Sequence, residues 1–70
     1  MRFSIYLFGG RKAAPTFEKA LEYAQSQVDL HYDRTGSFGE SYAVIFDGLT
    51  HYRWLVYVER HGDIKYKLVY

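Results

Sequence analysis

The chain contains one segment with helical periodicity, and this feature limits the possible folds more than any other. Pro15-Thr16 begins the segment, because a threonine at this position can cap a helix, and Glu18 suits the positive amino end. Apolar residues then recur at helical spacing, at Phe17, Leu21, Ala24 and Val28. We expect the helix to end near Asp33. A single helix covers only one face of a sheet.

Four other segments alternate as strands do: Arg2 to Phe8, Ser41 to Asp47, His51 to Arg60, and Asp63 to Tyr70. Gly9-Gly10 ends the first of them. Seventy residues provide one hydrophobic core and not two, so residues 1–70 form a single domain. The predicted class is α+β, with a single helix packed on a four-stranded, mainly antiparallel sheet in the chain order β-α-β-β-β.

Turn lengths predict which side chains share a face. A three-residue loop at Arg60-His61-Gly62 places Val58 opposite Ile64, and the same argument at Gly48-Leu49-Thr50 places Phe46 opposite Tyr52. The helix is then expected to cover the apolar side, made of Phe3, Ile5, Leu7, Val44, Phe46, Trp54, Val56, Ile64 and Leu68.

The opposite face has no second helix to cover it. It is expected to combine rings and aliphatic groups with cations, at Tyr6, Phe8, Ile45, Arg53, Leu55, Tyr57, Lys65, Lys67 and Val69. This composition is typical of interfaces, so we predict a partner-binding surface, formed by Tyr6, Phe8, Arg53, Leu55, Tyr57, Lys65 and Lys67. The alternatives are that the rings merely cover a small sheet and that the lysines protect an edge strand.

Charge is unevenly distributed although the formal net charge is only +1. The first twelve residues carry Arg2, Arg11 and Lys12 without an acid, and the last strands are also basic. The middle of the chain is acidic. Within it, the acids of the helix form a second possible contact face, made of Glu18, Glu22 and Asp29.

Several function classes find little support in the residues. The chain has no cysteine, no apolar run near the length of a membrane helix, and no signal-peptide pattern, so we expect a cytoplasmic protein that does not enter membranes. His31, His51 and His61 are scattered near predicted turns, which predicts neither an active site nor a metal site, and no cofactor is implied. Gly9-Gly10-Arg11-Lys12 lies where an anion can bind, but its spacing fits no phosphate loop, and a turn with solvated charges explains it.

Eight Tyr, five Phe and one Trp in a short cysteine-free chain, with one helix on an antiparallel sheet, define a recognisable layout. In this layout the chain resembles small phage-encoded inhibitors of bacterial defence, anti-CRISPR proteins among them. The resemblance implies a non-catalytic protein that acts by stoichiometric protein–protein contact, with a nucleic-acid-handling complex as its partner.

Two further functions stay open at this point. The aromatic and basic face could bind nucleic acid, with rings stacking on bases, although the acidic middle of the chain opposes contact with a phosphate backbone. A small homodimeric structural or adaptor protein is the other alternative, since two copies could bury the same surface against each other.

Overall fold

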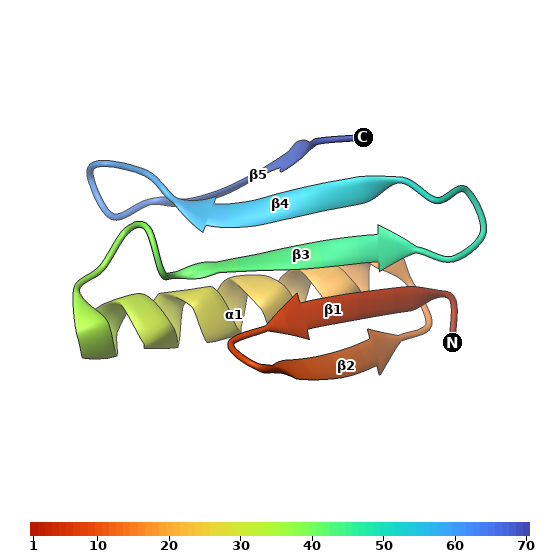
Figure 1. The fold of residues 1–70 in the computed structure, drawn as a ribbon, viewed down its shortest axis with the longest axis horizontal. Coiled ribbons are helices and arrows are strands. Elements are labelled where there is room, and N and C mark those ends of the chain that lie inside the picture. Colours follow the sequence, from red (N-terminus) through yellow and green to blue (C-terminus); the bar gives the residue numbers. More distant parts are fainter.

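A computed structural model describes residues 1–70, and its sheet has five strands and not the four that were predicted. The elements in chain order are β1 (Phe3–Leu7), β2 (Gly10–Ala14), α1 (Phe17–Thr35), β3 (Tyr42–Asp47), β4 (Arg53–Val58) and β5 (Ile64–Leu68). The strands lie in the order β2-β1-β3-β4-β5, and every neighbouring pair is antiparallel. α1 lies on one side of this sheet, behind it in Figure 1, so the α+β class is confirmed.

The strand that the sequence did not predict is β2, an edge strand. Gly9 takes a left-handed φ of 84° in the turn after β1, and the chain then runs back along β1 with Leu7 opposite Gly10 and Phe3 opposite Ala14. Glycine adopts this φ without strain. β2 lacks large apolar residues and has two adjacent cations, so periodicity gives no signal for it.

α1 begins and ends with the capping groups that its sequence offers. The Thr16 hydroxyl accepts a hydrogen bond from the Lys19 amide at 3.2 Å, which confirms the predicted cap. At the other end, Gly36 has a φ of 68° and donates its amide to the Tyr32 carbonyl at 2.7 Å. The helix therefore ends two residues beyond the predicted Asp33.

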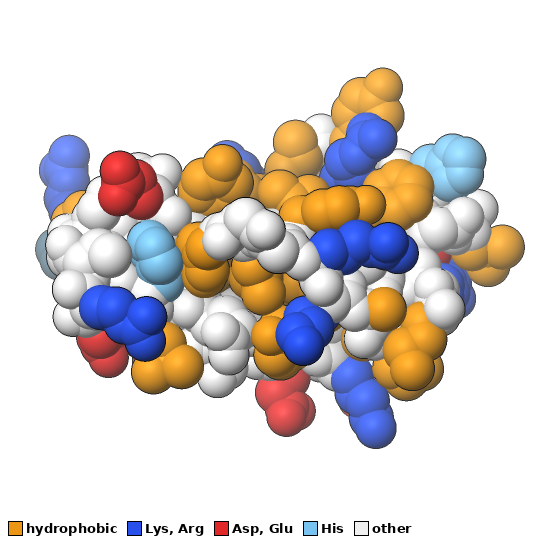
Figure 2. Space-filling view, turned by 60° about the horizontal axis from the view of Figure 1, so that its bottom comes forward, with side chains coloured by type: hydrophobic (Ala, Val, Ile, Leu, Met, Phe, Trp, Pro, Cys, Tyr) orange, Lys and Arg blue, Asp and Glu red, His pale blue; other side chains and the backbone are white.

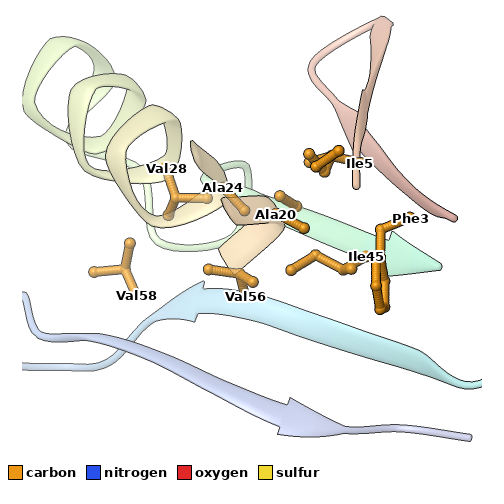
Figure 3. Close-up of a cluster of buried hydrophobic side chains, with 10 residues drawn as sticks. Phe3, Ile5, Ala20, Ala24, Val28, Ile45, Val56 and Val58 are labelled. Atoms are coloured by element: carbon orange, nitrogen blue, oxygen red, sulfur yellow. The ribbon is translucent and has the colours of Figure 1, made fainter. Parts of the chain in front are cut away.

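Small side chains fill the space between α1 and the sheet. Ala20, Ala24 and Val28 of α1 are fully buried, and the sheet side chains that face them include Ile5 and Ile45 (Figure 3). Ala24 and Val28 were predicted in this stripe. Its other two predicted members, Phe17 and Leu21, are half-buried and pack around the core.

The predicted face of β3 is wrong. Ile45 is fully buried on the helix side, whereas Val44 and Phe46 lie on the other side of the sheet. The cause is the loop after β3, which is one residue longer than the predicted turn, so that Phe46 lies opposite Arg53 and not Tyr52. A shift of one residue exchanges the two faces of a strand.

The hairpin of β4 and β5 has the predicted register, with Val58 opposite Ile64 and Trp54 opposite Leu68. Gly62 has the left-handed φ, 88°, that the predicted loop requires. Leu68, however, is 54% exposed and not buried, because β5 forms an edge of the sheet that α1 covers only in part.

Candidate functional site

The side of the sheet away from α1, called the open face below, is covered by no other element of the chain. Alternation along the strands and the register between them place twelve strand residues on it: Ser4, Tyr6, Arg11, Ala13, Tyr42, Val44, Phe46, Arg53, Leu55, Tyr57, Lys65 and Lys67. Four of these residues are cations and none is an acid. Figure 2 shows, from the side of β2, hydrophobic side chains interleaved with Lys and Arg.

Cations on the open face lie against aromatic rings. The Arg53 guanidinium carbon is 5.3 Å from the centroid of Phe46 and 5.0 Å from that of Tyr70. The Lys67 ammonium is 5.4 Å from the centroid of Tyr57. Such contacts attract the charge to the ring face, so these long side chains are partly ordered before any partner arrives.

A hollow of about 580 Å³ lies at one end of the open face, between the turn after β1 and the loop before β3. Tyr6 and Tyr42 line it and are each about half exposed, and Glu40 adds one carboxylate. Phe8 also borders the hollow, and its ring stacks on His31 of α1 with centroids 4.0 Å apart and an interplanar angle of 9°.

Six of the seven residues predicted to bind a partner lie together on the open face. Tyr6, Arg53, Lys65 and Lys67 are exposed there, and Leu55 and Tyr57 are half-buried. Phe8 is the exception, since its ring packs against the helix, although it also borders the hollow.

Sequence reasoning missed three residues of β3 and two of β2 on this face: Tyr42, Val44, Phe46, Arg11 and Ala13. The signal that could have placed the β3 residues is Asp47, which ends the strand. Its carboxylate accepts hydrogen bonds from the Leu49 amide and the Thr50 hydroxyl, both at 2.9 Å, as an aspartate does when it organises a turn.

Asp47 also holds the amino end of the chain. Arg2 donates two hydrogen bonds to its carboxylate, from Nε at 2.9 Å and from Nη2 at 2.8 Å, and the Asp47 side chain is only 3% exposed. The hydrogen bonds from Arg2 lower the pKa of Asp47 far below its usual range, against the opposing effect of burial. The same pairing raises the pKa of Arg2. Because Asp47 ends the central strand β3 on the helix side of the sheet, this pair contributes to the fold.

The predicted acidic contact residues, Glu18, Glu22 and Asp29, are all exposed on α1, across the sheet from the open face. The molecule therefore presents a basic aromatic face on one side and a helix with several acids on the other. The two sides of the molecule therefore differ in charge.

His31, His51 and the glycine turn each have a place in the fold. His31 shares a hydrogen bond of 2.8 Å with the fully buried Ser41, which fastens α1 to the start of β3. His51 occupies the left-handed position of the loop after β3, with a φ of 67°, and no group of three His, Cys, Asp or Glu side chains is placed to hold a metal ion. Gly9 lies in the turn into β2, and Gly10 is the first residue of that strand.

The single helix lacks the length of apolar sequence that crossing a bilayer requires. Comparisons of the chain with known protein families, with curated proteins and with solved structures gave no match.

Proposed function

We propose that this chain is a non-catalytic binding protein that acts by stoichiometric contact with another protein, and that its open face is the docking surface. The observation that supports the proposal most strongly is the charge of this face, where four cations and no acid accompany four aromatic rings. The partner surface that complements it is acidic, with apolar groups between the acids.

The size of the open face agrees with a protein partner. The molecule measures 34 × 20 × 18 Å, so its broad face approaches the roughly 800 Å² that each side of a standard interface buries. Tyrosine and arginine are the residue types that most often dominate binding energy, and Tyr6, Tyr42 and Arg53 are exposed on this face.

The resemblance in size and layout to small phage-encoded inhibitors extends the proposal to a nucleic-acid-handling complex as the partner, and to a cytoplasmic location. A complex of this kind carries basic grooves as well as acidic surfaces. The open face fits an acidic surface, whereas Glu18, Glu22 and Asp29 on α1 would fit a basic groove.

The test compares two charge-changing variants of the tagged protein. Tyr42→Ala with Arg53→Glu alters the open face, and Glu22→Lys with Asp29→Lys alters the helix; both pairs are exposed, so we expect melting temperatures near that of the wild type. Partner capture should be reduced at least about tenfold by the first pair and little by the second. Loss with the helix pair alone would move the interface to α1.

Single-stranded nucleic acid is the second candidate, favoured by the rings beside cations. This candidate is weaker, because cations already lie over the rings of Phe46, Tyr57 and Tyr70. A base that stacks on one of these rings would have to displace the cation. Fluorescence anisotropy with a labelled oligonucleotide at low and high salt separates the two functions. Tight binding that falls steeply with salt, together with capture lost on nuclease treatment, would replace the protein partner with nucleic acid.

A further inference from the structure

β5 is an edge strand whose two sides differ in chemistry. Lys65 and Lys67 point to the open face, and Ile64, Tyr66 and Leu68 point to the helix side. β5 pairs with β4 on one side, and no strand of the chain pairs with it on the other (Figure 1).

The hydrogen bonds to β4 show which backbone groups of β5 are free. Val69 donates its amide to the Arg53 carbonyl at 2.8 Å, and the Glu59 amide donates to the Asp63 carbonyl at 2.8 Å. Because an antiparallel strand alternates its bonding direction residue by residue, the odd-numbered residues bond to β4. The amide and carbonyl groups of Ile64, Tyr66 and Leu68 therefore point outward, where an additional strand could bond to them.

The helix side of this edge offers an incomplete apolar cluster. Phe17 lies between Trp54, at 4.7 Å between centroids, and Tyr66, at 6.0 Å. Tyr66 is 48% exposed, and Leu68 is more exposed still. Apolar side chains from a sixth strand would continue the cluster and remove these groups from water.

A second copy of β5 fits this edge poorly. In the antiparallel register that pairs Tyr66 with its equivalent, and so uses all three outward-pointing residues, Lys65 of each copy lies opposite Lys67 of the other. Like charges directly opposite each other destabilise a strand pair.

The other edge of the sheet lacks this division. β2 carries Arg11 on the open face and Lys12 on the helix side, and its remaining residues are Gly10, Ala13 and Ala14. A strand added there would meet a cation on each side and little apolar surface. The two edges thus differ in what they can accept.

We propose that the outer edge of β5 binds an extended segment of a partner protein in which acidic and apolar residues alternate. The acids lie beside Lys65 and Lys67, the apolar residues lie beside Tyr66 and Leu68, and the backbone of the segment bonds to the outward-pointing groups of β5. This inference does not depend on docking at the remainder of the open face, because the bonding groups lie at the sheet edge.

The probe is a labelled peptide that alternates valine and glutamate and is slightly longer than the five residues of β5. One control peptide alternates valine and lysine in the same pattern. The other has the same valines and glutamates as the probe, grouped in two blocks. We expect binding of the alternating acidic peptide, with roughly three- to tenfold weaker binding of either control, since charge and alternation each contribute through cross-strand pairs. Equal binding of all three would overturn the proposal.

Tyr66→Pro tests the backbone contribution. The Tyr66 amide points away from β4, so proline removes an outward donor without removing a bond between β4 and β5. Its matched control is Tyr66→Ala, which removes the ring and keeps the amide. Proline should weaken peptide binding at least about tenfold relative to alanine, because strand addition needs that donor. Binding by the folded proline variant as tight as that of the alanine variant would exclude strand addition.

Lys65→Glu with Lys67→Glu tests the charge and does not depend on the proline variant folding, since both side chains are exposed. This pair should reverse the preference, so that the valine–lysine peptide binds more tightly than the acidic one. An unchanged preference would contradict the proposal. Tyr42→Ala with Arg53→Glu should leave peptide binding intact, which separates this edge from the docking surface of the proposed function. A stable dimer in light scattering that Tyr66→Pro converts to monomer would assign the edge to a second copy instead.

Discussion

The two faces of β3 differ in a way that hydrophobicity alone does not predict. Under the helix, this strand places Ala43, Ile45 and Asp47, and on the open face it places Tyr42, Val44 and Phe46. The two aromatic rings of β3 thus lie on the face without a helix.

The reason is the space available between a helix and a sheet. Protein interiors are closely packed, and α1 contributes the fully buried Ala20 and Ala24 to the core. Methyl-sized groups on the helix allow it to lie close to the aliphatic side chains of the sheet, where rings on the helix would hold it away. In a chain with one helix, the helix therefore packs more closely on the sheet when most rings lie at the rim of the core and on the open face.

The first way to test the comparison is to truncate neighbouring residues of β3. Ile45→Ala should lower the free energy of unfolding by about 2–5 kcal/mol, because Ile45 is fully buried and its loss leaves a cavity. Val44 is half-buried on the open face, so Val44→Ala should lower the free energy of unfolding clearly less. Urea unfolding monitored by the fluorescence of Trp54 measures both values. Equal losses would mean that the open face is as closely packed as the covered one.

A second test enlarges one residue on each side of β3. Ala43 is fully buried beneath the helix, so Ala43→Leu should destabilise the fold by roughly 1–3 kcal/mol through overpacking. Val44→Leu adds volume on the open face, and we expect a change within about 0.5 kcal/mol. Thermal melts of both variants provide the measurement. Tolerance of leucine at position 43 would show that the helix has room to move.

The third test uses the one acid on the covered side of β3. The pKa of Asp47 is lower in the folded state than the roughly 3.9 expected when unfolded, so its ionised form stabilises the fold above about pH 4. As the pH falls further, the unfolded state binds a proton first and this contribution is lost. Asp47→Asn should therefore be less stable than the wild type at neutral pH, with a difference that shrinks in acid.

Melting temperatures between about pH 2 and pH 7 would show this convergence. Asp29→Asn is the control, because it makes the same substitution at an exposed residue of α1. A constant gap between Asp47→Asn and the wild type across the whole range would mean that the carboxylate contributes through its shape and not through its charge.

Much of the fold and of the candidate site follows from local patterns. The Thr16 cap, the helical spacing through Val28 and the loop at Gly62 each depend on neighbouring residues, and the structure agrees with all three. The same local patterns placed Leu55 and Tyr57 on the face away from the helix, as the β4 register requires.

The parts that were not predicted depend on contacts distant in sequence. Asp47 is held by Arg2, 45 residues away, and the Gly48 amide donates to the Arg2 carbonyl at 2.8 Å. The loop after β3 is one residue longer than predicted, and its left-handed residue is His51 and not a glycine. The longer loop exchanges the faces of β3.

The sequence alone determined the α+β class, the single capped helix and the uncovered aromatic and basic sheet face. These features follow from periodicity, helix caps and turn residues, which act between residues close together in the chain. Only the tertiary structure decided the fifth strand, the face of β3 and the free edge of β5. β2 has no apolar alternation that would predict it. The face of β3 and the free edge of β5 depend on which strands become neighbours across the whole sheet.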